Sequence, residues 1–279
     1  MSGLRRRLVL NAAVVVIAAA LAATAWLELG RETGAERIAG IEPDAVRVIR
    51  VQKADGSLVR MERTEGGWRI VEPVDAPASA FHVDQLLDLL RQRSRARYGT
   101  HEVDPEALGL IPPRAQLAFN GTGVAIGDAT GGLRHVRVGD GDIYLVDDRF
   151  MPLLQGQWWN FLDRHLLGDG AAPPVALRTP ELTIRRAEGD WESDGALPAE
   201  AIGPLMAAWR DVEALVARPL EDLPADARPV AVVELADGSR RRFAAPEEEG
   251  EVRLVDPDAQ VAYVLSRELR RYLLTGEQP

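Results

Sequence analysis

Four sequence signals occur in the same order in both halves of the chain, and this repetition limits the possible folds more than any other feature. They are a glycine turn before a tryptophan, an amphipathic helix pattern, a turn ending in glycine and a Leu-Val-Asp strand. In the first half the signals are Gly66–Trp68, the series Val83, Leu86, Leu87 and Leu90, Asn120–Gly121 and Leu145–Asp147. In the second half they are Gly189–Trp191, the series Ile202, Leu205, Met206 and Trp209, Asp237–Gly238 and Leu254–Asp256. So long a period predicts duplication of a whole unit, joined near residues 168–174, although any α+β chain offers turns and helices of this kind.

Each unit is predicted to contain short strands and one principal helix. In the first half, a run rich in β-branched residues, with Val46, Val48 and Val51, is followed by an Asp-Gly turn and a second apolar run, the pattern of a hairpin. Ser79 is suited to cap a helix whose apolar residues recur with helical spacing. Further strands are expected at residues 68–71, 115–119, 124–127, 135–138 and 143–146. The predicted fold class is α+β, with two similar, mainly antiparallel β units that each carry one principal helix.

An almost uninterrupted apolar run at residues 8–28 follows Arg5, Arg6 and Arg7. About 20 apolar residues in a helix span the roughly 30 Å hydrocarbon core of a bilayer, and flanking arginines keep their end in the cytoplasm. We therefore predict a single-pass transmembrane helix whose membrane contacts come from Leu8, Val14, Val16, Ile17, Leu21, Trp26 and Leu27. The alternative is a signal peptide cleaved after Ala25, because Ala23-Thr24-Ala25 has the small-x-small pattern of a cleavage site.

The predicted organisation follows from the anchor and the repeat. It consists of a basic cytoplasmic N-terminus (1–7), a transmembrane anchor (8–28), a polar tether (29–40), a first α+β unit (41–167) and a second α+β unit (168–279). The chain has no cysteine, which excludes disulfides and thiolate sites. Its formal net charge of -10 disfavours a nucleic-acid partner, which would require a basic surface. Nearly all the positive charge is arginine, and Lys53 is the only lysine.

Residue patterns typical of catalysis, metal binding or cofactor binding are absent from the sequence. The histidines, His82, His101, His135 and His165, do not have the i, i+2 or i, i+4 spacing of a metal pair. The glycine-rich residues 120–127 lack the Gly-Lys-Ser/Thr of a phosphate loop, so a hairpin turn is the favoured interpretation. We predict no catalytic, cofactor or metal residues and a non-enzymatic protein. A site built from carboxylates distant in sequence remains a third possibility.

Trp158, Trp159 and Phe161 form the densest aromatic cluster of a chain that is only 5% aromatic. Aromatic side chains bury well and also form contacts at interfaces. Because the cluster comes just before the predicted join, packing between the two units is the first interpretation. Contact with a partner protein or with the membrane surface is the alternative.

Several structural motifs together resemble a known family. They are the strand Gly67–Ile70 with Pro73 and Ala78 behind it, the helix through Leu86–Leu90, the element Leu108–Pro113, and the strands Ile126–Asp128 and Ile143–Val146. This set, within residues 41–166, resembles the bacterial domain-of-unknown-function family of membrane-anchored envelope proteins found beside gliding-motility-type ABC transporters. The resemblance implies an accessory role at an ABC-type export complex, with the body in the periplasm and the anchor in the inner membrane. It carries over no catalytic residue.

Two functions follow as hypotheses. The first is a periplasmic accessory or scaffold protein that binds membrane-protein partners such as ABC transporter subunits. The second is a module that holds a small molecule, a glycan or a lipid in the cleft between the two units, because clefts between domains are common binding sites.

Overall fold

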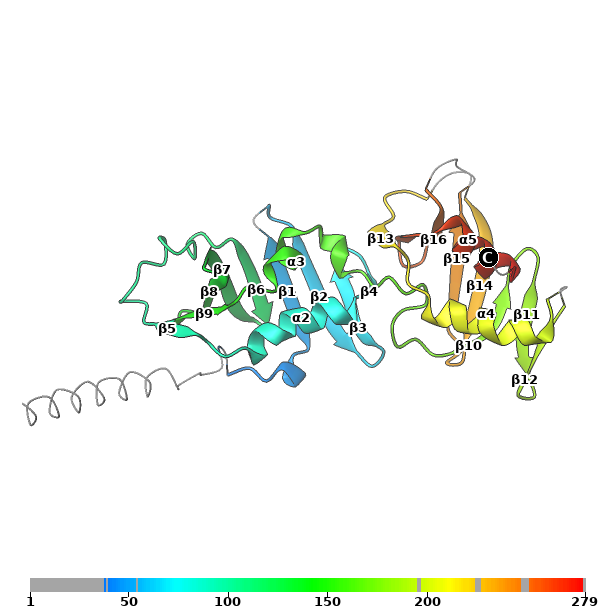
Figure 1. Ribbon diagram of the computed structural model, residues 1–279, viewed down its shortest axis with the longest axis horizontal. Coiled ribbons are helices and arrows are strands. Elements are labelled where there is room, and N and C mark those ends of the chain that lie inside the picture. Colours follow the sequence, from blue (N-terminus) through cyan, green and yellow to red (C-terminus); the bar gives the residue numbers. More distant parts are fainter. Residues whose placement is uncertain are drawn as a thin grey trace, which may run out of the picture.

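The computed structural model describes residues 38, 40–53, 55–194, 197–223, 227–246 and 251–277. These residues form a nine-stranded sheet and an eight-stranded sheet, each with its own helices (Figure 1). All strand pairs in both sheets are antiparallel. The polypeptide completes the first sheet before it begins the second, so the chain has two sequential units.

The first sheet has the strand order β4-β3-β2-β1-β6-β7-β8-β9-β5. Its strands are β1 (Val48–Lys53), β2 (Leu58–Thr64), β3 (Gly67–Glu72), β4 (Ala76–Pro77), β5 (Ala96–Tyr98), β6 (Ala115–Phe119), β7 (Thr122–Thr130), β8 (Leu133–Val138) and β9 (Ile143–Asp147). The short helical segments are η1 (Pro43–Ala45), α3 (Met151–Gln155) and η2 (Trp158–Phe161), and the long helix is α2 (Ala80–Arg91). Because β4 and β5 lie at opposite edges, α2 carries the chain from one edge of the sheet to the other.

The second sheet has the order β12-β11-β10-β14-β15-β16-β17-β13. Its strands are β10 (Pro174–Arg178), β11 (Thr183–Ala187), β12 (Asp190–Ser193), β13 (Val216–Pro219), β14 (Arg228–Leu235), β15 (Arg240–Ala245), β16 (Arg253–Asp256) and β17 (Val261–Val264). Its helices are α4 (Ala199–Asp211) and α5 (Arg267–Thr275). Apart from the additional edge strand β4, this order is that of the first sheet, element by element, with α4 in the place of α2 and α5 in the place of α3.

The turns explain why the strands pair in this register. In the β1–β2 hairpin, Asp55 Oδ1 accepts a hydrogen bond from the Ser57 N–H (2.8 Å), and Gly56 has φ +85°. The β14–β15 hairpin of the second unit uses the same bond, from the Ser239 N–H to Asp237 Oδ1 (2.9 Å). An aspartate that accepts from the backbone two residues later stabilises a tight turn, and glycine adopts a positive φ without steric cost.

The core lies between each sheet and its helices. In β1, every second residue, Ile49, Val51 and Lys53, is buried, as expected when one strand face is covered. Helix α2 begins where the Ser79 side chain accepts from the His82 N–H (3.4 Å), and its predicted apolar face is buried. Helix α4 buries Ile202, Leu205, Met206 and Trp209 and packs against β10, β12 and α5.

The predicted α+β class is wrong. The described residues form mainly antiparallel β-structure, with strands β1 to β17 and only four α-helices, α2, α3, α4 and α5, of 12, 5, 13 and 9 residues. The prediction of one principal helix per unit also missed α5 in the second unit. Strands as short as β4, β5 and β13 carry too few residues for a period of two to be recognisable, so the prediction underestimated the β content.

The predicted repeat is aligned with the structure at three of its four signals. The glycine turns precede β3 and β12, the helix patterns lie in α2 and α4, and Asn120–Gly121 and Asp237–Gly238 connect β6 to β7 and β14 to β15. The fourth pair is misaligned. Leu145–Asp147 lies in β9, whereas Leu254–Asp256 lies in β16, the strand that takes the place of β8.

The predicted anchor at residues 8–28 and the arginines at 5–7 lie outside the described residues. Among the helices that the structure describes, none combines the length and apolar character needed to cross a bilayer. Ile38, in the predicted tether, is buried with an exposed fraction of 3%.

Candidate functional site

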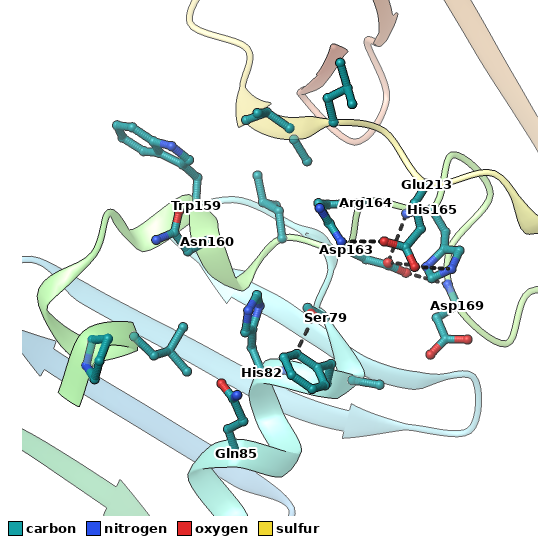
Figure 2. A pocket seen from close by; sticks show the side chains of 18 of the residues that line it. Ser79, His82, Gln85, Trp159, Asn160, Asp163, Arg164, His165, Asp169 and Glu213 are labelled. Atoms are coloured by element: carbon teal, nitrogen blue, oxygen red, sulfur yellow. Dashed lines mark hydrogen bonds and ion pairs between the residues drawn. The ribbon is translucent and has the colours of Figure 1, made fainter. Parts of the chain in front are cut away.

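A cleft with a volume of about 790 Å³ lies where the two units meet. Its walls come from the start of α2, from the segment containing α3 and η2, and from the residues that enter β13 (Figure 2). The first two walls belong to the first unit and the third belongs to the second. The lining residues used below are Ser79, Phe81, His82, Arg149, Trp159, Asp163, Arg164, His165, Asp169, Glu213 and Leu215.

A buried carboxylate, that of Asp163, lines this cleft and accepts hydrogen bonds from neighbouring residues. Asp163 is only 4% exposed, and its Oδ1 accepts from the His165 N–H at 3.0 Å and lies 2.7 Å from His165 Nδ1. Its Oδ2 accepts from the Asp169 N–H. Because the carboxylate is acceptor only, the His165 tautomer with hydrogen on Nδ1 fits this arrangement. Asp163 therefore fixes both the loop that follows it and the direction of the imidazole.

The same segment contacts the second unit. His165 Nε2 lies 3.6 Å from Glu213 Oε1, and Arg164 Nη2 pairs with Glu213 Oε2 (Figure 2). The backbone joins here as well, since the Ala214 N–H donates to the Arg164 carbonyl at 2.8 Å. Main-chain and side-chain contacts thus hold the entry to β13 against the end of the first unit.

Large apolar side chains border the cleft on both units. Phe81, at the start of α2, is 67% exposed, and Leu215, just before β13, is 65% exposed. Trp159 also lines the cleft and is half-buried, with its ring centroid 6.0 Å from that of Trp158 in an edge-to-face arrangement. A concave surface with exposed apolar side chains and surrounding charges is typical of a binding site.

His82 lines the cleft, and its pKa departs from the ordinary value for histidine. Burial lowers the pKa of His82 below its ordinary value of 6.5; the main chain at Asn160 opposes this effect, and the positive charge of Arg164 adds to it. Its Nδ1 is buried and has no hydrogen-bond partner among the described residues. The histidine is therefore neutral at neutral pH, and its side chain is half-buried.

This lowered pKa predicts a pH dependence of stability. As the pH falls below 6.5, the unfolded chain takes up a proton at His82 before the folded chain does, so the free energy of unfolding falls until the folded pKa is reached. Urea denaturation of His82→Gln at pH 7.5 and pH 5.5 should show a smaller loss on acidification than the unchanged protein shows. Arg164→Gln should give an intermediate loss. Equal losses in His82→Gln and the unchanged protein would contradict this account.

Chemically, the cleft offers an imidazole held by a carboxylate but shows no nucleophile aligned with it. Ser79 lines the cleft, yet its hydroxyl oxygen caps α2, and no hydrogen bond joins it to His165 in the described part of the chain. No group of three His, Cys, Asp or Glu side chains among the described residues is placed to hold a metal ion. The geometry is suited to binding and to joining the units.

The predicted aromatic cluster lies at this junction. Phe161 is fully buried, and its carbonyl accepts from the Ser79 N–H at 2.8 Å, while η2 contacts β13 of the second unit. Trp158 and Trp159 are half-buried against the core. Contact of Trp158, Trp159 or Phe161 with a partner stays a prediction.

No motif in the sequence marks the Asp163, His165 and Glu213 cluster. Asp163 and His165 are two residues apart, a spacing that is typical of metal-binding histidine pairs but carries no specific signal for a carboxylate beside a histidine. Glu213 comes from the other unit, 48 residues after His165, and only the fold brings it close. Comparison of the chain with models of protein families, with curated proteins and with solved structures gives no match.

Proposed function

We propose that this protein is a periplasmic accessory protein, tethered to the bacterial inner membrane, that binds a component of an ABC-type transporter complex in the cleft between its two units. One observation carries the proposal: Phe81 and Leu215, exposed apolar side chains from different units, border the same cleft. Isolated apolar residues are common on protein surfaces, but apolar residues gathered in a concave site with a polar surround favour a protein partner.

The charges around the cleft support a specific contact. Arg149, Arg164, Asp169 and Glu213 line it together with the apolar residues. In protein interfaces, apolar anchors supply most of the affinity, and a rim of mixed charge supplies orientation and selectivity. A segment of a partner that carries one or two apolar side chains between polar residues fits this surface.

The tether and the partner class rest on sequence. The apolar residues 8–28 and the preceding arginines, which lie outside the described residues, favour an anchor with the body on the periplasmic side. The resemblance of residues 41–166 to envelope proteins encoded beside ABC transporters supplies the partner. Anchoring keeps the cleft close to membrane proteins and raises its effective concentration there.

The proposal predicts that the apolar pair is required for binding. Phe81→Ser combined with Leu215→Ser should reduce the transporter subunits that co-purify with the full chain from membranes by about tenfold or more, because truncation of central apolar contacts costs about 1 to 4 kcal/mol of binding energy. Ile111→Ser is the matched control, since Ile111 is 46% exposed and does not line the cleft.

Two results would contradict the proposal. One is recovery of the unchanged protein from membranes without any transporter subunit. The other is an equal loss of subunits in the Ile111→Ser control. Circular dichroism of each variant separates loss of binding from loss of folding.

A small-molecule ligand is the second candidate, and the volume of the cleft favours it. Pockets for small ligands have volumes of about 300 to 1,000 Å³, a range that includes this cleft. Native mass spectrometry of the purified full chain would detect such a ligand as a defined added mass. Phe81→Ser should reduce the fraction of the protein that carries this mass.

A further inference from the structure

A second cavity, of about 500 Å³, lies within the first unit and is lined by three cationic side chains. They are Lys53 at the end of β1, Arg114 just before β6 and Arg134 in β8. Met151, Leu154 and Gln155 of α3 form another wall, and Asp55, Asp128 and Ala129 complete the lining. None of these residues lines the cleft between the units.

Lys53 is buried, and among the described residues no carboxylate is bonded to its ammonium group. It is 8% exposed, and the hydrogen-bond partner of its Nζ among the described residues is the Gly156 carbonyl. Burial lowers the pKa of Lys53, and the negative charge of Asp55 opposes this only in part. An ammonium has three N–H donors, so donors remain after the bond to Gly156. A buried cation with unused donors is costly unless an anion compensates it.

Arg134 presents a second buried cation to the same cavity. It is also 8% exposed; its Nη1 donates to the Gly127 carbonyl at 2.7 Å and its Nη2 to Asp148 Oδ2 at 2.6 Å. Its Nε is buried and has no partner in the described part of the chain. Arg114, held by Asp128 through bonds of 2.7 and 3.1 Å, is more exposed.

The duplicate unit indicates that the charge of Lys53 is not required to build the fold. At the equivalent place, directly after β10, stands Thr179, which is 9% exposed and whose hydroxyl donates to the Leu274 carbonyl of α5 at 2.9 Å. Lys53 makes the corresponding bond to the segment that follows α3. A neutral hydroxyl therefore suffices to join the first strand to the helical segment in this topology. The only lysine of the chain provides a charge beyond that structural role.

We propose that this cavity binds a small molecule through an oxyanion, a phosphate or carboxylate group, received by Lys53, Arg134 and Arg114. Such a group can accept hydrogen bonds from the N–H donors that the Lys53 ammonium leaves unused after its bond to Gly156. Charge-assisted hydrogen bonds of this kind are among the strongest in proteins. The proposal does not depend on binding of a partner at the cleft.

The single lysine makes a direct test possible. In the full chain, in detergent and labelled with ¹³C- and ¹⁵N-lysine, one ε-methylene signal reports on Lys53 alone. Inorganic phosphate and acetate are added separately at constant ionic strength, with chloride as the reference. We expect a saturable shift of this signal with at least one of the two anions and a rise in the pKa of Lys53 at saturation, because a bound anion favours the charged amine. The tighter anion identifies the class of ligand.

Paired arginine variants locate the site. Arg114→Gln should weaken binding about tenfold, as expected for loss of one charge-assisted hydrogen bond. Arg242→Gln is the matched control, because Arg242 holds Asp258 through bonds of 3.0 and 2.7 Å in the second unit, away from this cavity. Arg242→Gln should leave the affinity unchanged.

Three results would overturn the proposal. They are no saturable shift with either anion, equal shifts with chloride, or equal affinity in Arg114→Gln and the unchanged protein. Either of the first two would show that Lys53 is only a structural contact to Gly156, and the third would show that the anion is not bound in the cavity that Arg114 lines.

Discussion

Replacing Trp209 with alanine should lower the free energy of unfolding by about 3 to 5 kcal/mol, the range for loss of a buried tryptophan or phenylalanine. Trp209 has no exposed surface, and its ring centroid lies 5.4 Å from that of Phe243. Its Nε1–H donates to the Leu273 carbonyl at 2.9 Å and so joins α4 to α5. The substitution therefore creates a cavity and leaves a buried carbonyl without its donor.

Urea denaturation followed by circular dichroism measures this loss. Trp191→Ala is the control, because Trp191 is half-buried in β12, where the Arg186 guanidinium lies 5.7 Å from its ring centroid. We expect a loss of about 1 kcal/mol there, as for substitutions at partly exposed positions. Similar losses for both variants would contradict the view that burial of Trp209 and its bond to Leu273 make it more important for stability than Trp191.

Asp163→Ala should cost about 3 kcal/mol or more and should loosen the junction between the units. The carboxylate accepts from two backbone N–H groups and from the His165 ring, and each buried donor left without its acceptor costs about 1 to 3 kcal/mol. His165 and Arg164 would then lose the fixed position from which they meet Glu213. The radius of gyration from small-angle X-ray scattering should increase as the units separate.

Glu213→Gln removes the exposed ion pair with Arg164 and leaves the buried hydrogen bonds of Asp163 in place. The Glu213 and Arg164 side chains are 47% and 51% exposed, and an exposed ion pair contributes about 0 to 1 kcal/mol. Its loss should therefore be several times smaller than that of Asp163→Ala. If both variants lose the same stability and keep the same radius of gyration, Asp163 does not hold the junction.

Local sequence patterns predicted the turns, caps and helices that are stabilised by interactions between residues close together in sequence. The Asp55-Gly56 turn, the Ser79 cap and the apolar series of α2 and α4 depend on residues within a few positions of one another, and the structure has each of them. The strand that contains Leu254 was matched to the wrong partner, because short apolar strands look alike in sequence and only their pairing distinguishes them. Edge strands of two to four residues gave no usable period at all.

The cleft and the cavity were harder to predict from sequence, since they are formed by residues that are distant along the chain. No pattern joins Asp163 to Glu213, or Phe81 to Leu215, before the units are in place. Lys53 is different. Its position after Ile49 and Val51, on the same strand face, already indicates burial, and it is the only lysine. The alternation of buried residues along β1 is thus a signal in the sequence that points to burial of this lysine.

The two equivalent outer strands, β5 and β13, differ in their contacts with the other unit. β13, the outer strand of the second sheet, contacts η2 of the first unit, whereas the main contact of its counterpart β5 is with β9 of its own sheet. Unpaired strand edges invite pairing with other chains, which leads to aggregation. β5 has only three residues, and its central Arg97 forms an ion pair with Asp142. Short length and charge thus oppose edge-to-edge association at β5, whereas its counterpart β13 contacts the neighbouring unit.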